Sequence, residues 1–490
     1  TIVAFLVFSS LFFYSWWNPA YLPLILISML GNFYLGVYLN KKRSKNLLIV
    51  GIGLNLFSIA YFKYAGFFIS NVNTLFDIQV NFHSIILPLA ISFFTFQQIA
   101  YLVDSYRGET QESDPLNYAL FITFFPQLIA GPIVHHKEML PQFSSNKSIL
   151  TAENFIIGIS IFSLGFFKKT VLADGIAPFS NKIFLLAEAG ETIDILTAWA
   201  GALAYTFQLY FDFSGYSDMA IGLARIFGII LPLNFYSPYK ATNISEFWRR
   251  WHMTLSRFLR DYIYIPLGGN RKGEISRYKN LFATMLLGGM WHGAGWNFII
   301  WGALHGIYLA ICHSFGKINI PIFNFVPRLL KKYLAWLITM IAVVVGWVFF
   351  RAVSFDAALN MLQGMSGMNG MSVPIGIFVR MGDSMQQVLT SIGITSSSMG
   401  GSDFIKVWLW VIISLIIVLV FPNTQDIFSK NSGSLNHLSF VKKDTFWPFY
   451  RLAKKIIWKQ NLRWAFISAC LFTLGILTLG QVSEFLYFQF

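Results

Sequence analysis

The chain has 490 residues, of which 56% are hydrophobic and only 12% are charged, and its formal net charge is +14. Soluble globular proteins carry roughly 25% charged residues, so this composition excludes an ordinary water-soluble domain and predicts an integral membrane protein. The lysines and arginines lie between apolar stretches, where they act as topology signals, and this distribution argues against nucleic-acid binding. The two cysteines, Cys312 and Cys470, form neither a metal-ligand pattern nor a disulfide framework.

Apolar stretches follow one another along the chain, and a helix needs about 20 such residues to cross the hydrocarbon core. We interpret the first stretch as a transmembrane helix rather than a signal peptide, because no basic segment precedes it. One stretch contains Pro126 and Pro132 and is expected to enter the membrane and return. The candidate spans are about 2–17, 21–40, 46–70, 84–103, 117–134, 153–172, 194–210, 214–232, 281–312, 333–350, 404–421 and 464–486.

These spans predict an all-α polytopic membrane protein with about ten to twelve transmembrane or re-entrant helices. Residues 1–490 are expected to form a single integral membrane domain, because the sequence shows no internal repeat and no soluble domain of independent size.

The distribution of basic residues predicts the orientation of the chain, because loops rich in Lys and Arg stay in the cytoplasm. The basic segments 41–45, 245–279 and 442–463 are therefore expected on the cytoplasmic side. The segment 352–403 has Arg380 as its single basic residue and is expected to be an extracytoplasmic loop.

Two aspartates lie in the apolar region that begins near Tyr205. An acid at the centre of a spanning helix costs about 2.5–3.5 kcal/mol on insertion scales, so each should face a partner or a cavity. Asp212 and Asp218 are expected mainly to hold helices together, through hydrogen bonds or an arginine. Asp218 is the better candidate to line a polar chamber.

A basic, aromatic segment follows between residues 245 and 271. Aromatic and aliphatic side chains recur on one face at helical spacing, and arginines occupy the rest, which is typical of an amphipathic helix in the membrane interface. One reading of the segment is lipid anchoring alone. The other is that Arg249 and Arg250 bind the phosphates of a nucleotide-bearing donor that arrives from the cytosol.

Two histidines occur in the apolar stretch that follows. His292 lies between Trp291 and Gly293, and His305 lies further along. A histidine in such a stretch is a functional-site candidate, because burial favours the neutral imidazole, which can accept a proton. From these points His292 is either catalytic or structural, and His305 is expected to pack. No HxxH or HxxxH spacing indicates a metal site.

Three strings carry a family resemblance: Phe-Trp-Arg-Arg-Trp-His at 247–252, Tyr-Ile-Pro-Leu-Gly-Gly-Asn-Arg at 264–271 and Gly-Gly-Met-Trp-His-Gly at 288–293. They resemble the membrane-bound O-acyltransferase (MBOAT) family, in particular its bacterial branch of alginate and peptidoglycan O-acetyltransferases. The resemblance is dense over residues 85–310, which we take as the catalytic core, and poor over 352–403 and the C-terminal third.

The resemblance implies helices around a central tunnel, with a cytosolic acyl-thioester at one mouth and an acceptor at the other. It implies that His292 is the catalytic histidine and that His252 matches a second polar residue of the family's site. It also implies the inner membrane of a bacterium and a periplasmic or membrane-anchored acetyltransferase partner. The further candidates for contacts with donor or substrate are Trp291, Arg249, Arg250 and Asp218.

The expected reaction is acetyl transfer from acetyl-CoA, as substrate, to hydroxyls of an alginate-type exopolysaccharide or of peptidoglycan. His292 would act as general base on the attacking hydroxyl, or on a carrier that later delivers the acetyl group. No permanently bound cofactor is expected. The rival hypotheses are a polytopic transporter or channel and a scaffold for an export complex. Against the transporter, the unusual polarity concentrates in residues 205–305 and no duplication is visible.

Overall fold

The computed structural model describes residues 2–82, 85–110, 112–143, 151–316, 325–397, 400–430, 455–480 and 486. This part of the chain is mostly helical and contains two short strands, which confirms the all-α class predicted from the sequence. Most of the expected cytoplasmic segment 442–463, and part of the expected span 464–486, lie outside the described residues.

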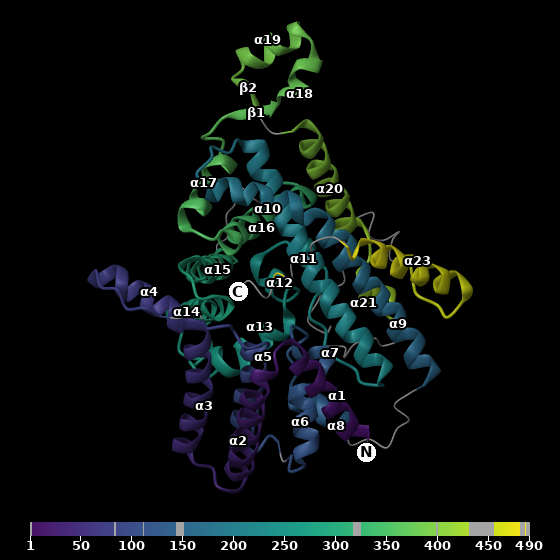
Figure 1. Ribbon diagram of the computed structural model, residues 1–490. Helices are drawn as coiled ribbons and strands as arrows, with labels where there is room; N and C mark the ends of the chain where they lie inside the picture. The colour runs from purple at the N-terminus through teal and green to yellow at the C-terminus, as the bar shows by residue number, and fades with distance from the viewer. Residues whose placement is uncertain are drawn as a thin grey trace. The chain divides into compact units, whose positions relative to one another are not determined.

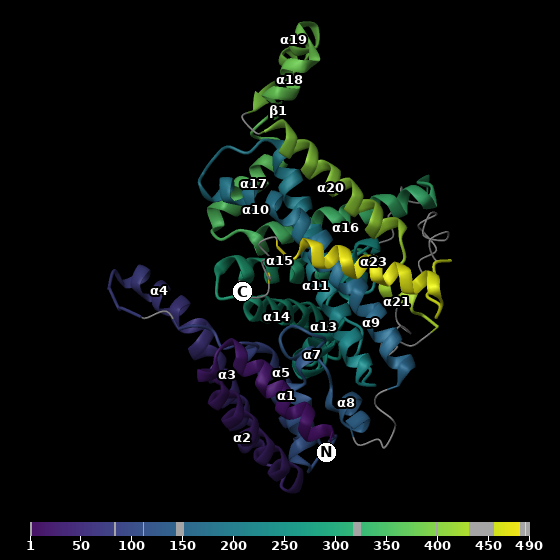
Figure 2. The ribbon, with the colours of Figure 1, turned by 45° about the vertical axis from the view of Figure 1, so that its right-hand side comes forward.

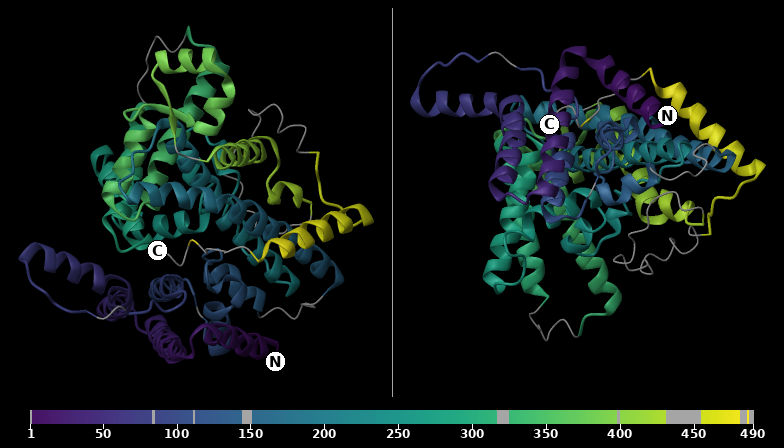
Figure 3. Two further views of the ribbon diagram at one scale, coloured as in Figure 1. Left: turned by 45° about the horizontal axis from the view of Figure 1, so that its top comes forward. Right: turned by 90° about the horizontal axis from the view of Figure 1, so that it is seen from below.

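The chain groups into two compact units, each described by itself below. The first contains the residues up to Phe162 together with Tyr216–Asn234, and the second contains Ser163–Gly215, Phe235–Lys430 and the described C-terminal residues. Figure 1, Figure 2 and Figure 3 show the elements of both units from several directions. The single-domain organisation expected from the sequence stays a prediction.

Buried side-chain amides of Asn32, Asn55 and Gln98 connect α2, α3 and α5 in the interior of the first unit. Asn32 Nδ2 donates to Asn55 Oδ1 (3.3 Å) and to Gln98 Oε1 (2.8 Å), and Asn55 Nδ2 donates to Asn32 Oδ1 (2.7 Å). Such paired amides join apolar helices where no water is present to satisfy them. The elements that begin in this unit are α1 Ile2–Trp17, η1 Pro19–Tyr21, α2 Leu22–Lys41, α3 Lys45–Ile59, η2 Ala60–Tyr64, α4 Ala65–Phe76, α5 Ile91–Arg107, α6 Pro115–Thr123, α7 Phe125–Leu128, α8 His136–Phe143 and α9 Ala152–Phe167.

The second unit contains all the candidate histidines, and α14 and α15 form its most extensive helix pair. Its elements are η3 Lys168–Ala173, α10 Asp174–Glu188, α11 Ile195–Ile226 (which continues into the first unit), η4 Pro238–Lys240, α12 Ile244–Trp248, α13 Met253–Leu259, η5 Arg260–Tyr264, α14 Glu274–His292, α15 Trp296–Phe315, α16 Arg328–Arg351, α17 Phe355–Met365, β1 Met371–Pro374, α18 Ile375–Phe378, η7 Val379–Met381, α19 Asp383–Ser391, β2 Ile394–Ser397, α20 Gly401–Val420, α21 Thr424–Ile427 and α23 Leu462–Thr478.

Among the described residues, six helical segments are long and apolar enough to cross a membrane, and the shorter apolar helices α1 and α23 accompany them. The polytopic class is therefore confirmed. The sequence-based number of spans also counted shorter or more polar segments, such as α5 and α14, which do not reach this length and hydropathy. The expected central tunnel stays a prediction. The six segments are Pro19–Lys41, Lys45–Phe76, Ala152–Glu188, Trp296–Phe315, Arg328–Arg351 and Gly401–Val420.

One of these segments contains a π-helical turn, η3, and a buried charge cluster. Lys169 in this turn places its Nζ 2.6 Å from Asp174 Oδ1 and 2.8 Å from Asp212 Oδ1. All three side chains are buried. Asp212 therefore joins helices as expected from the sequence, but its partner is a lysine rather than an arginine.

The sequence predicts separate spans over 194–210 and 214–232, and this boundary is wrong because α11 runs without a break from Ile195 to Ile226. Gly215 does not interrupt the helix. A Cβ on Gly215 would lie 2.7 Å from the carbonyl oxygen of Gly165, so this glycine permits the close approach of two helices.

Candidate active site

The hairpin of α14 and α15 determines the position of His292, the last residue of α14. The sequence predicts one span over 281–312, which is wrong because the backbone is extended at Gly293 and Gly295 between the two helices. The helices meet at Gly289 and Gly302, where a Cβ on Gly302 would lie 3.1 Å from the Cα of Gly289. This close backbone packing fixes the end of α14 and the histidine that it carries.

Aromatic rings enclose the imidazole of His292. Its ring centroid lies 4.9 Å from that of Trp291, 5.0 Å from Trp301 and 5.2 Å from Phe350. The residue is only 7% exposed. His292 therefore lies in a buried, largely aromatic environment.

Trp301 also contacts the second histidine of this stretch, His305, at 4.9 Å between ring centroids. The indole Nε1 of Trp248 donates to His305 Nδ1 at 3.3 Å, so His305 carries its own proton on Nε2. His305 is fully buried, as the packing role expected from the sequence requires. Trp301 therefore contacts the rings of both His292 and His305, and the hydrogen bond from Trp248 fixes the ring of His305.

His252 lies in the same unit, at the start of α13, with its backbone in the left-handed region (φ 42°, ψ 53°). Its ring contacts Phe213 at 4.8 Å and Trp291 at 6.3 Å between centroids. Because Trp291 also contacts His292, the structure brings His252, Trp291 and His292 together, three of the residues that the sequence analysis selected.

The sequence predicts an amphipathic surface helix within residues 245–271, and this prediction is wrong because the backbone makes a left-handed turn at His252. The segment instead forms two short helices, α12 and α13, which are separated by that turn. Trp248 and Trp251 are buried on the protein side rather than facing lipid, and each packs against further aromatic rings. The aromatic face of residues 247–259 is therefore part of the protein interior.

The two candidate arginines have different surroundings. Arg250 is fully buried; its Nη2 donates to Glu246 Oε1 at 2.8 Å and its Nη1 donates to the Tyr236 carbonyl at 3.3 Å. Its guanidinium is thus engaged in holding this segment, which gives no support to a phosphate contact. Arg249 is exposed.

Asp218 is buried within the first unit, and its role in lining a substrate chamber stays a prediction. Sequence reasoning did not select Trp301 and Phe350, although both contact His292. Trp301 could have been found, because it lies one helical turn before His305 on the same apolar helix. In the described part of the chain, no three His, Cys, Asp or Glu side chains gather as metal ligands.

Acid is expected to destabilise the protein through His252, which lies outside the spanning helices. Burial lowers the pKa of His252 to about 3, whereas an unfolded histidine has a pKa of about 6.5. The stability that the neutral ring provides is complete above about pH 6.5 and is lost as the pH falls toward 3, because only the unfolded chain binds the proton. Replacing His252 with Asn, which tolerates a left-handed backbone, should flatten the fall of the thermal midpoint on acidification.

This pH dependence is measured by thermal unfolding of the wild type and of His252→Asn in detergent, from about pH 6.5 down toward pH 3. Burial also lowers the pKa of His136 to about 4, but this residue contributes equally to both proteins, so their difference isolates His252. Identical acid slopes for the wild type and His252→Asn would contradict the prediction.

The comparison with protein families identifies the class. The model of the membrane-bound O-acyltransferase family matches residues 11–355, more than half of the chain, and the chain therefore belongs to this family. It is an O-acyltransferase of the membrane, which decides against the transporter and scaffold hypotheses.

Particular relatives extend this result. The chain is 48% identical to the peptidoglycan O-acetyltransferase of Helicobacter pylori over 398 residues, which cover 75% of this chain and 74% of that protein. It is 44% identical to the probable alginate O-acetylase AlgI of Pseudomonas aeruginosa over 371 residues, 74% of this chain and 69% of that protein. A teichoic acid D-alanyltransferase of Bacillus subtilis is 31% identical over 250 residues, 48% of this chain and 62% of that protein.

Proposed function

We propose that this enzyme transfers an acetyl group from acetyl-CoA toward hydroxyls of an extracytoplasmic polysaccharide, with His292 as the general base. The single observation that carries the proposal is the buried imidazole of His292 inside its aromatic enclosure. The relatives named peptidoglycan O-acetyltransferase and probable alginate O-acetylase support acetyl as the transferred group and these two polysaccharides as acceptors.

In the proposed step, a hydroxyl oxygen attacks the thioester carbonyl carbon of acetyl-CoA. A C–O bond forms and the C–S bond breaks, while the hydroxyl proton passes to His292 and then to the leaving thiolate. Proton transfer by a positioned imidazole contributes about 10²–10⁴-fold to the rate. The attacking hydroxyl belongs either to the polysaccharide or to a carrier that later delivers the acetyl group.

His252 is proposed to assist by donating an N–H to the thioester oxygen or by orienting the acyl group. A neutral imidazole has one N–H donor, and a fixed donor at a developing oxyanion accelerates acyl transfer. The contact of Trp291 with both histidines supports this role and supports Trp291 as a wall of the donor site.

Arg249 is proposed to bind the CoA phosphates. Its exposure leaves its guanidinium accessible, and the surrounding segment 245–279 is rich in lysine and arginine. A guanidinium binds phosphate through two parallel hydrogen bonds. Arg250 is better explained as the residue that holds α12 in place through Glu246.

The proposed location is the inner membrane of a bacterium, with the donor on the cytosolic side. This orientation is supported by the segment 245–279, which is rich in lysine and arginine, and by the segment 352–403, which has one basic residue, Arg380. A periplasmic or membrane-anchored acetyltransferase is proposed to complete the delivery to the polysaccharide.

Purified full-length protein in liposomes, supplied with acetyl-CoA labelled in its acetyl group, tests this function. We expect release of CoA thiol and, when the acceptor polysaccharide and a membrane extract are added, label in base-labile esters of the polysaccharide. Octanoyl-CoA serves as the matched donor. Faster thiol release from octanoyl-CoA than from acetyl-CoA would contradict the proposed donor, and label confined to lipid would contradict the proposed acceptor.

A further inference from the structure

A small subdomain, residues 371–397, lies in the chain between α17 and α20 and holds a hollow that the proposed chemistry does not use. Its two strands pair in parallel, with Met371 opposite Ile394 and Pro374 opposite Ser397. α18, η7 and α19 lie between these strands in the chain, and Figure 1 shows them grouped together. We call residues 371–397 the outer subdomain, since they fall in the segment expected outside the membrane.

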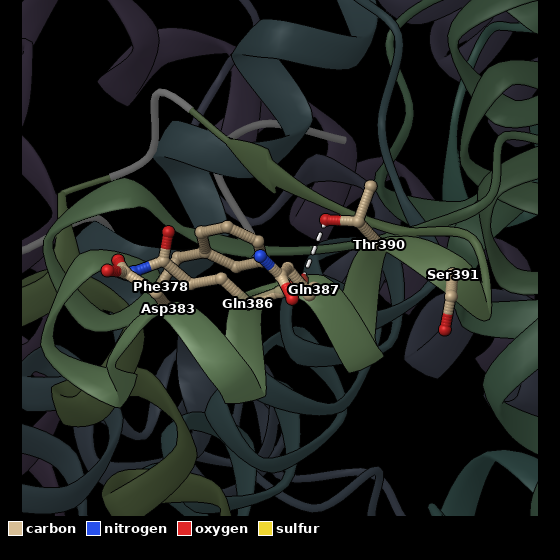
Figure 4. A pocket seen from close by; sticks show the side chains of 6 residues that line it. All are labelled: Phe378, Asp383, Gln386, Gln387, Thr390 and Ser391. Atoms are coloured by element: carbon tan, nitrogen blue, oxygen red, sulfur yellow. Dashed lines mark hydrogen bonds between the residues drawn. The ribbon is translucent and has the colours of Figure 1, made fainter.

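The hollow has a volume of about 570 Å³ and opens to the surface of the outer subdomain. Figure 4 shows its lining side chains, with Asp383 at one end of the view, Ser391 at the other and the ring of Phe378 between them. The lining combines one aromatic ring, two amides, two hydroxyls and one carboxylate, which belong to Phe378, Gln386, Gln387, Thr390, Ser391 and Asp383.

Part of this lining is held in place by the backbone. Gln386 Nε2 donates to the Val379 carbonyl at 3.2 Å, which ties α19 to the segment that carries Phe378. Thr390 Oγ1 donates to the Gln386 carbonyl at 2.8 Å, so its hydroxyl oxygen still has lone pairs for a ligand. Phe378 is partly buried, whereas Asp383 and Gln387 are exposed.

A pyranose chain matches this set of groups. The aliphatic C–H face of a sugar ring packs on an aromatic ring, and the sugar's hydroxyl and N-acetyl groups pair with amides and hydroxyls, which both donate and accept hydrogen bonds. A few polar groups around an apolar contact fix the orientation of a ligand in a pocket. An open hollow suits a stretch of polymer rather than an enclosed monomer.

The charge of the lining distinguishes the two polysaccharide classes of the proposed function. The six lining residues include one carboxylate, Asp383, and neither lysine nor arginine. A polyuronate carries a carboxylate on every sugar, and like charges brought together in a binding site disfavour the wrong ligand. A chain of neutral N-acetylated amino sugars meets no such repulsion.

We infer that the outer subdomain binds the acceptor glycan and selects a backbone of N-acetylated amino sugars over a polyuronate. This inference rests on the proposed function for the identity of the acceptor class. The subdomain would hold the polymer near the enzyme without taking part in the chemistry at His292.

The test compares the affinities of two tetrasaccharides for the protein in detergent, measured by ligand-observed NMR. One is the neutral N-acetylglucosamine tetramer and the other is the anionic mannuronate tetramer. We expect the neutral tetramer to bind more tightly, and Phe378→Ala to weaken its binding about tenfold, as removal of an aromatic anchor does. Asp383→Asn should narrow the difference between the two tetramers. The matched control is Met385→Ala, because Met385 is an exposed residue of α19 in the same subdomain and does not line the hollow.

Thiol release from acetyl-CoA by the same samples separates this inference from the proposed function. Glycan binding that depends on Phe378 supports the inference even where acetyl-CoA is not consumed. Absence of binding, equal losses in Phe378→Ala and Met385→Ala, or preference for the mannuronate tetramer would each overturn it, even in protein that consumes acetyl-CoA normally.

Discussion

Replacing His292 with alanine is expected to lower acetyl-CoA turnover by about 10²–10⁴-fold, the usual contribution of a general base. The rings that surround it belong to tryptophans and a phenylalanine, which cannot accept the proton in its place. The loss should appear in kcat, with little change in KM for acetyl-CoA, because in the proposed step His292 takes the proton of the attacking hydroxyl and does not bind the donor. Release of CoA thiol by the purified protein measures both constants.

Two further variants make this result interpretable. His292→Gln keeps most of the volume of the side chain and should be as inactive as the alanine variant. Trp296→Ala changes a residue of the same hairpin that is 58% exposed, and it should retain turnover. Equal turnover in wild type and His292→Ala would remove His292 from the chemistry, and an equal loss in Trp296→Ala would indicate damage to the hairpin instead.

Replacing Lys169 with methionine is expected to destabilise the protein by about 3–5 kcal/mol, the range for removing one partner of a buried ion pair. The ammonium of Lys169 lies between two buried carboxylates, those of Asp174 and Asp212. Without it, both acids are left close together in an apolar interior. Thermal unfolding in detergent should therefore show a clear drop of the midpoint temperature.

Lys182 provides the matched control, because its Nζ lies 2.7 Å from Asp403 Oδ2 but its side chain is 52% exposed. Lys182→Met should change stability by at most about 1 kcal/mol, as exposed pairs do. Adding Asp212→Asn to Lys169→Met should recover part of the loss, since one unpaired charge is removed. Equal midpoints for Lys169→Met and Lys182→Met would contradict the importance of the buried cluster.

The sequence predicted the helical membrane class because composition and apolar run length depend little on tertiary contacts. It failed over residues 211–213, where it expected a boundary and α11 continues without a break, and at Gly293, where glycines separate two helices. Gly215, inside α11, permits the close approach of a neighbouring helix and does not break its own helix, unlike Gly293. Whether a glycine ends a helix or permits close packing depends on which other helix lies nearby, and the local sequence does not contain this information.

The candidate site was predictable where long strings carried it, and the structure groups His252, Trp291 and His292 together. Periodicity failed for residues 248–262, because it cannot register a single left-handed residue such as His252. It also could not show that Arg250 is buried against Glu246 while its neighbour Arg249 is exposed. Phe350 comes from α16, far along the chain, where the sequence offers no signal of contact with His292.

The π-helical turn η3 has a consequence for how the length of this chain can vary. A π turn accommodates one residue more than the α-helical repeat. The turn absorbs this extra residue, so the helix keeps its register on both sides of it. Lys169 and Asp174 are five residues apart and meet across the turn, whereas residues i and i+5 of a regular α-helix lie about 140° apart around the axis. Deleting one residue from 170–173 would restore the regular repeat and leave the lysine and the aspartate four residues apart, on one face of the helix. A single-residue deletion is therefore expected to be tolerated better within this turn than elsewhere in the same apolar helix.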